Sequence, residues 1–184
     1  MQEKLAIVVV DMLNDFVYGA LKCERGLATI EPLSRLLDSA RENGIPVIFS
    51  NDAHHEGIDH ELKKWGDHAL VGSEGAQVIP ELNQQESDYV VPKKRYSGFF
   101  QTDLDLLLRE LKVDGVVLAG LHTHMCVRHT AADAYQYGYK VYVAEEATNA
   151  FTEEDHVSGI KYLKDVYDAE VLSVDELISI FKNQ

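Results

Sequence analysis

The sequence predicts a three-layer α/β fold, in which a mostly parallel sheet of about six strands lies between helices on both faces. Short apolar, β-branched runs alternate along the chain with longer segments in which leucine and alanine recur at helical spacing. The chain has 184 residues, of which 46% are hydrophobic, and it contains no repeat, low-complexity tract or linker. We therefore expect residues 1–184 to form one domain.

The strand candidates are continuous runs of β-branched and aliphatic residues that end in polar residues or glycine. Such runs are typical of parallel strands that are buried on both faces. They are Leu5–Val10, Val47–Ser50, Tyr89–Val91, Gly115–Ala119, Lys140–Val143 and Glu170–Ser173.

The helix candidates lie between these strands and carry the expected start and stop signals. In the first of them, Pro32 suits an opening turn, and Gly44 ends the helix. Thr102 is the expected cap of another. The predicted helices are Pro32–Asn43, a short one at Ala76–Leu82, the segment from Thr102 through Leu111, Arg128–Gln136, His156–Tyr167 and Asp175–Phe181.

Charge and cysteine content limit the partners and the compartment. The net charge of -14 argues against nucleic acid and anionic membranes as partners. No run approaches the roughly 20 apolar residues that a membrane span needs, and no signal peptide is visible. Cys23 and Cys126 lie in unlike contexts, so we expect no disulfide and a cytoplasmic location. We assign Cys23 no role, and we expect a homo-oligomer.

Four of the predicted strands are followed by residue types that can carry chemistry. These residues are Asp11, Asp52, Lys93 and, after a short turn, Cys126. Ligands of open α/β sheets bind at the carboxyl ends of the strands. Each polar residue alone could be an ordinary turn residue, but together they favour an active site at this edge.

Cys126 lies where a strand stops and a helix starts. Backbone N–H groups and the helix dipole at such a position stabilise a thiolate. The alternative is a small buried apolar residue, which most free cysteines are. His129, one helical turn later, could pair with the thiol, but no third residue that would orient it is evident.

Asp11, Lys93 and Cys126 together could form a nucleophilic centre. Asp11 can accept the thiol proton and pass it to a leaving amine, while the Lys93 ammonium holds both anions. Taken singly, Lys93 could be a solvated lysine beside Lys94 and Arg95, and Asp11 could be a cap at a strand end.

Several segments, in the right order, resemble the isochorismatase-like cysteine hydrolases and, within that family, the nicotinamidases. The resemblance covers most of the chain. The segments are Val9-Val10-Asp11-Met12-Leu13-Asn14-Asp15-Phe16, Asn51-Asp52-Ala53-His54, Trp65-Gly66-Asp67-His68, Gly72-Ser73-Glu74-Gly75-Ala76, Lys93-Lys94-Arg95-Tyr96-Ser97-Gly98-Phe99 and Gly120-Leu121-His122-Thr123-His124-Met125-Cys126-Val127.

The resemblance implies an amidase that works through a thioester on a cysteine. Its catalytic residues would be Asp11, Lys93 and Cys126, with the spacing to the Ser-x-Phe segment favouring Lys93 over Lys94. A cis peptide would join Leu121 to His122, and the N–H groups of His122 and Cys126 would form the oxyanion hole. The substrate-binding side chains would be Phe16, Trp65, Tyr96 and Leu121.

The same resemblance implies one divalent metal ion, held by a loop region at about 51–75. Its ligands would be Asp52, His54 and His68, with Glu61 as a further candidate. Zn²⁺ is the preferred ion, and Mn²⁺ or Fe²⁺ would also accept these donors. Without the resemblance, a polar loop with histidines is usually only a loop.

These observations leave three hypotheses for function. The first is a metal-dependent amidase that hydrolyses nicotinamide to nicotinate and ammonia. The second is a hydrolase of another small amide or ureide, because the segment after Lys93 is shorter than in many nicotinamidases. The third is a binding or redox domain with an idle thiol.

Overall fold

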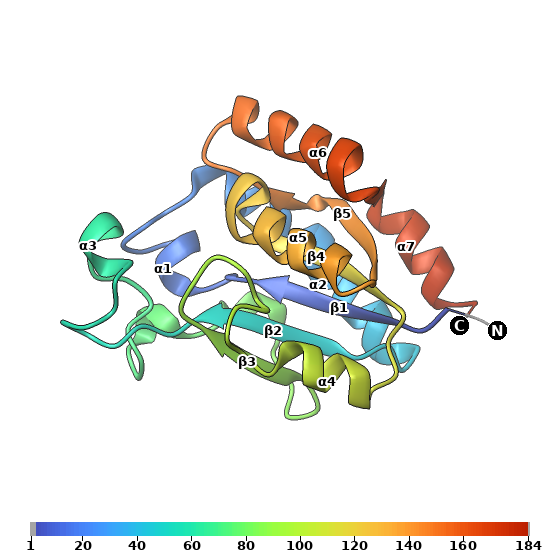
Figure 1. Cartoon of the computed structure of the whole chain (residues 1–184), viewed down its shortest axis with the longest axis horizontal. Coiled ribbons are helices and arrows are strands. Elements are labelled where there is room, and N and C mark those ends of the chain that lie inside the picture. Colours follow the sequence, from blue (N-terminus) through green and yellow to red (C-terminus); the bar gives the residue numbers. More distant parts are fainter. Residues whose placement is uncertain (1–2, 184) are drawn as a thin grey trace.

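The computed structural model describes residues 3–183. The fold is built on one central sheet of six parallel strands (Figure 1). In space the strands follow the order β3-β2-β1-β4-β5-β6. Their bounds are Leu5–Val10 (β1), Val47–Asp52 (β2), Tyr89–Lys93 (β3), Gly115–Leu121 (β4), Lys140–Asn149 (β5) and Glu170–Leu172 (β6). The predicted fold class is therefore confirmed.

Helices cover both faces of the sheet. One face carries α2 and α7, and the other carries α4, α5 and α6 (Figure 1). The α-helices are Asn14–Val17 (α1), Ile30–Glu42 (α2), Leu62–Trp65 (α3), Leu104–Glu110 (α4), Arg128–Gln136 (α5), Glu153–Tyr167 (α6) and Val174–Phe181 (α7). Short 3-10 turns lie at Glu24–Thr29, Pro80–Leu82 and Glu74–Ala76, and a π-helical turn at Thr123–Val127.

The alternation of side chains along β1 explains why this run is apolar throughout. Leu5, Ile7 and Val9 point into the core under α2 and α7, whereas Ala6 and Val8 point into the core under α4, α5 and α6. A strand covered on both faces buries every residue, so it has no polar position.

The strand order reverses next to β1, which fixes where a ligand can bind. The chain leaves β1 toward β2 and β3, returns through α4, and then adds β4 on the other side of β1. The carboxyl ends of β1 and β4 therefore lie side by side at a topological switch point, which is the usual ligand site of such sheets.

Some predicted elements differ in detail. The predicted helix Ala76–Leu82 is wrong, because two 3-10 turns flank an extended segment in which Val78 pairs with Leu13. Helix α6 begins before His156, because Thr152 caps it at Asp155 N–H. Strand β5 extends past Val143 to Asn149, where it continues to pair with β4.

Within residues 3–183, none of the helices combines the length and the apolar character needed to span a membrane.

Candidate active site and metal-binding group

The carboxyl ends of β1, β2, β3 and β4 bring together the side chains expected from the sequence. Asp11 follows β1, and Asp52 and Lys93 end β2 and β3 as directly paired residues. Gly120, near the end of β4, has φ +98, and a Cβ there would lie 2.1 Å from the Val10 carbonyl oxygen. A glycine is thus required for β4 to approach β1 this closely.

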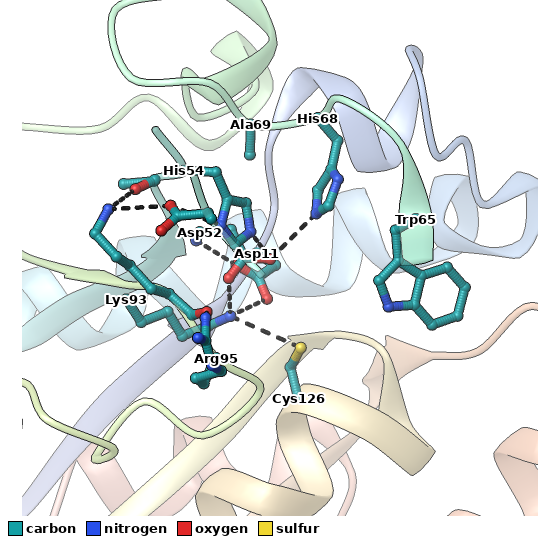
Figure 2. Close-up of polar contacts among 12 residues, drawn as sticks. Asp11, Asp52, His54, Trp65, His68, Ala69, Lys93, Arg95 and Cys126 are labelled. Atoms are coloured by element: carbon teal, nitrogen blue, oxygen red, sulfur yellow. Dashed lines mark hydrogen bonds and ion pairs between the residues drawn. The ribbon is translucent and has the colours of Figure 1, made fainter. Parts of the chain in front are cut away.

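The Lys93 ammonium lies at the centre of the site (Figure 2). Its Nζ is 2.7 Å from Asp11 Oδ2, 2.6 Å from Asp52 Oδ1 and 3.7 Å from Cys126 Sγ. The Lys93 side chain is fully buried. The carboxylates of Asp11 and Asp52 balance its positive charge.

Alternation along β3 separates Lys93 from its neighbour. Val91 and Lys93 are buried, whereas Val90 and Pro92, which alternate with them, are exposed. Lys94 therefore points away from the sulfur, with its side chain 42% exposed, and its Nζ donates to the Ala53 carbonyl. An edge strand also tolerates Pro92, which cannot donate a ladder hydrogen bond.

The two carboxyl groups beside Lys93 have different proton affinities. Burial raises the pKa of Asp11 and the nearby Asp52 charge adds to this, so that despite Lys93 it reaches about 7. Burial also acts to raise the pKa of Asp52, but the charge of the Lys93 ammonium and the hydrogen bond that it donates outweigh burial, and the pKa falls to about 2. Asp11 is thus able to exchange a proton near neutral pH, and Asp52 stays ionised.

Cys126 lies in the π-helical turn Thr123–Val127 that leads into α5, and it is buried. Burial raises the pKa of its thiol well above the usual value, and the Lys93 ammonium only partly offsets this. The thiol is therefore protonated at rest, in contrast to the thiolate expected from a helix N-terminus. Attack by this sulfur requires a base, and Asp11, which shares the Lys93 ammonium with the sulfur, has a carboxyl group of suitable pKa.

The peptide bond between Leu121 and His122 is cis, as the resemblance implied. His122 precedes the turn and Cys126 lies within it, so both N–H groups expected in the oxyanion hole belong to this one segment. Thr148 fixes the segment from the other side, because its hydroxyl donates to the Gly120 carbonyl at 2.7 Å.

Asp52, His54 and His68 form a buried group whose donor atoms all lie within 4.8 Å of one another. Asp52 Oδ2 is 3.6 Å from His54 Nε2 and 3.9 Å from His68 Nε2. Two ligands of a tetrahedral zinc ion are about 3.4 Å apart when each bond is about 2.1 Å long. The spacing is too long for hydrogen bonds and suits a shared cation.

The outer ring nitrogens fix the tautomers that metal binding requires. His68 Nδ1 lies 2.7 Å from the Gly66 carbonyl oxygen, and His54 Nδ1 lies 3.3 Å from Asp59 Oδ2. Because both partners are acceptors, each Nδ1 carries the hydrogen and each Nε2 presents a lone pair toward Asp52. His54 Nε2 is buried without a hydrogen-bond partner among the described residues, so this donor set fits a divalent ion.

Glu61 is close to this group without belonging to it. Its side chain is buried at the start of α3, and burial raises its pKa, with a further contribution from the Asp52 charge. Among residues 3–183, the converging group of donor atoms consists of those of Asp52, His54 and His68.

A small cavity of about 20 Å³ borders the Cys126 thiol. Phe16, Trp65 and Tyr96 line it, as expected, and Trp65 Nε1 donates to the Tyr96 hydroxyl at 3.1 Å. Leu121 does not line it: the side chain is fully buried in the core under α2, next to Gly26. The reason is alternation along β4, which turns Leu121 away from the cavity.

Sequence reasoning missed several residues around the site. Leu21, Met125 and Phe151 also line the cavity, and Asp59 orients His54 from within the loop. Met125 stood within the recognised segment around Cys126, although nothing there gave it this role. No periodicity or motif marks Leu21, Phe151 and Asp59, because the tertiary fold alone brings them to the site. Asp15 stood within a recognised segment, but its partner in the metal loop could not be read from the sequence.

Comparison with known proteins places the chain in a family. The Isochorismatase domain model matches residues 5–176. N-carbamoylsarcosine amidase from Thermoplasma acidophilum is 40% identical, with a TM-score of 0.88 over 94% of this chain and 97% of that one. Nicotinamidase PncA from Bacillus subtilis is 32% identical, with a TM-score of 0.88 over 92% and 99%.

A third similar structure is the pyrazinamidase of Pyrococcus horikoshii in complex with zinc. It is 28% identical, with a TM-score of 0.86 over 92% of this chain and 99% of that one. The domain model matches most of the sequence, and solved structures share the fold at up to 40% identity. Both findings assign the chain to the same family. This chain belongs to the family of isochorismatase-like hydrolases.

Proposed function

We propose that this protein is a metal-dependent cysteine amidase that hydrolyses nicotinamide to nicotinate and ammonia. One observation carries the proposal: Lys93 Nζ lies 2.7 Å from Asp11 Oδ2 and 3.7 Å from Cys126 Sγ, beside the buried group of Asp52 and two histidines. Residues 1–184 act as one domain, with residues 51–75 as its metal-binding loop.

In the first half of the reaction, Asp11 takes the proton from the Cys126 thiol as the sulfur attacks the amide carbon. The developing oxyanion accepts hydrogen bonds from the N–H groups of His122 and Cys126. The C–N bond then breaks, and Asp11 returns the proton to the leaving nitrogen, which departs as ammonia and leaves a thioester.

In the second half, a water molecule attacks the thioester and gives its proton to Asp11. The C–S bond breaks, the carboxylic acid forms, and Asp11 reprotonates the sulfur. Throughout both halves, the Lys93 ammonium stabilises the anionic sulfur and the Asp11 carboxylate. The neighbouring carboxylates keep Lys93 charged, because they raise its pKa more than burial lowers it.

Asp52, His54 and His68 would hold the metal ion, with Zn²⁺ preferred and Mn²⁺ or Fe²⁺ as alternatives. When bound, the ion supplies a Lewis-acid site for a neutral donor atom, such as the pyridine nitrogen of the substrate or a water molecule. Phe16, Trp65 and Tyr96 supply flat surfaces that can stack on an aromatic ring.

A second candidate substrate is an N-carbamoyl compound. Support comes from the 40% identity to N-carbamoylsarcosine amidase, over 94% of this chain. The same attack on the carbamoyl carbon would release ammonia from such a substrate.

Ammonia release from matched amides tests both candidates. Purified protein is assayed with nicotinamide, pyrazinamide, N-carbamoylsarcosine and N-carbamoylglycine, before chelation and after it, with zinc or manganese restored. We expect turnover of nicotinamide that chelation removes and metal restores. Full activity in protein shown by elemental analysis to be metal-free would refute the metal requirement, and turnover of N-carbamoyl compounds alone would select the second candidate.

A further inference from the structure

We propose that Asp15 is a positioning residue for the metal ligand His68, and that Gly75 is a glycine because the Asp15 carboxylate needs its space. The inference rests on the metal site proposed above. Asp15 belongs to α1, which begins three residues after Asp11, so this residue connects the nucleophile side of the site to the metal-binding loop.

The Asp15 carboxylate holds the backbone immediately after His68. Its Oδ2 accepts the Ala69 N–H at 2.8 Å, and its Oδ1 accepts the Ala20 N–H at 3.2 Å. Ala69 is fully buried, and its carbonyl accepts the His54 N–H at 2.9 Å. The N–H and the carbonyl of Ala69 are therefore both hydrogen-bonded. The N–H is bound by Asp15 of α1, and the carbonyl is bound by the backbone of the metal ligand His54.

Ala69 needs such support because its backbone is left-handed, with φ +44. A residue with a Cβ adopts this conformation only at an energetic cost. Such a conformation persists where surrounding contacts stabilise the backbone by more than this cost. Figure 2 shows Ala69 directly beside His68, on the segment that follows Trp65.

A displacement of Ala69 would move the imidazole of its neighbour. His68 Nε2 lies 3.9 Å from Asp52 Oδ2, and its other nitrogen is tied to the Gly66 carbonyl. Metal–ligand distances tolerate deviations of only about 0.2 Å. Loosening the Ala69 backbone should therefore weaken metal binding without changing any ligand.

Gly75 lies on the other side of the carboxylate. A Cβ at this position would lie 2.1 Å from Asp15 Oδ2 and 2.4 Å from Asp15 Cγ. The φ of Gly75 is outside the left-handed region, so an alanine is sterically excluded by the carboxylate rather than by the backbone. Gly75→Ala should therefore push the carboxylate away from Ala69 and mimic its removal.

This pair of residues allows a double-mutant cycle. Zinc dissociation constants are measured on metal-free protein by competition with a chromophoric chelator for the parent, Asp15→Ala, Gly75→Ala and the double variant. We expect each single variant to bind zinc about 10- to 100-fold more weakly, as for other residues that orient metal ligands. The double variant should be no weaker than Asp15→Ala, because the new methyl group fills the space that the carboxylate left.

Asn14→Ala is the matched control. Asn14 Nδ2 donates to the Glu74 carbonyl at 2.9 Å, so this variant removes another hydrogen bond between α1 and the same loop, but one that does not reach Ala69. Its zinc affinity should stay within about threefold of the parent, since second-layer effects arise where a ligand is oriented. Melting temperatures without metal distinguish a loss of fold stability from a loss of metal affinity.

Zinc affinities within twofold of the parent for both single variants would overturn the proposal, as would affinity losses that multiply in the double variant. If Asp15→Ala does not fold, Gly75→Ala and Asp15→Asn decide the matter by the same measurement. A parent protein that binds neither zinc nor manganese would overturn the metal site and this inference together. Unchanged Asp15 and Gly75 variants in a metal-binding parent would overturn this inference alone.

Discussion

Replacement of Lys93 tests the centre of the proposed mechanism, because Lys94 provides a control at the next position. Lys93 Nζ is 3.7 Å from Cys126 Sγ. At an effective dielectric constant of about 20, an ammonium and a thiolate at that separation attract each other by about 4 kcal/mol. Part of this attraction is lost to compensation by nearby groups, so we expect Lys93→Ala to lower kcat/KM at least about 100-fold, or about 3 kcal/mol.

Lys94→Ala should remain within a few-fold of the parent. The Lys94 side chain is 42% exposed, and its contacts are the Ala53 carbonyl and, at 3.5 Å, Asp59 Oδ2. An exposed lysine with one long ion-pair contact contributes little.

The assay is steady-state ammonia release by both variants, with circular dichroism and thermal melting to confirm folding. Lys93→Ala leaves two buried carboxylates without their cation, which can destabilise the protein by several kcal/mol. Lys93→Met retains the apolar stem of the side chain and serves as a second variant. A folded Lys93→Met or Lys93→Ala enzyme with near-parental activity, or an inactive Lys94→Ala enzyme, would refute the reasoning.

Three further predictions concern the same strand ends. Cys126→Ala should abolish turnover while the melting temperature stays close to that of the parent, since a small residue replaces a small one; residual activity above a few per cent would exclude the covalent route. Burial and the Asp52 charge raise the pKa of Asp11 to about 7. We therefore expect kcat/KM to rise with pH through that region, as the Asp11 carboxylate forms. A flat profile between about pH 5 and 9 would argue against Asp11 as the base. Gly120→Ala should lower the free energy of unfolding, measured in urea, by more than about 3 kcal/mol. The reason is that the new methyl group would lie 2.1 Å from the Val10 carbonyl oxygen. A variant of parental stability would show that β4 can move away from β1.

The sequence was sufficient for the central strands β1, β2 and β4, because these are buried on both faces. Leu5–Val10 has no polar position, and the structure assigns the same residues to β1. It was insufficient for the segment 76–82, where short-range propensity suggested a helix. Pairing of Val78 with Leu13, a residue distant in the chain, keeps that segment extended.

Helix starts show the same division between local and tertiary control. Thr152 and Ser173 cap α6 and α7 through their own side chains, which is a local signal that the sequence carries. Strand β5 instead extends to Asn149 because it pairs with β4, and no local feature of residues 144–149 announces this.

For the site, the sequence alone determined which residues follow the strands, and hence that Asp11, Asp52, Lys93 and Cys126 gather at one edge of a parallel sheet. Only the tertiary structure decided the electrostatics and the supports. Burial raises the pKa of the Cys126 thiol well above its usual value despite the nearby Lys93 ammonium, so the resting thiol is protonated. The contact of Asp15 with Ala69 joins residues 54 positions apart. Local sequence fixes what a strand end carries, whereas desolvation and contacts between distant segments arise only when the chain has packed.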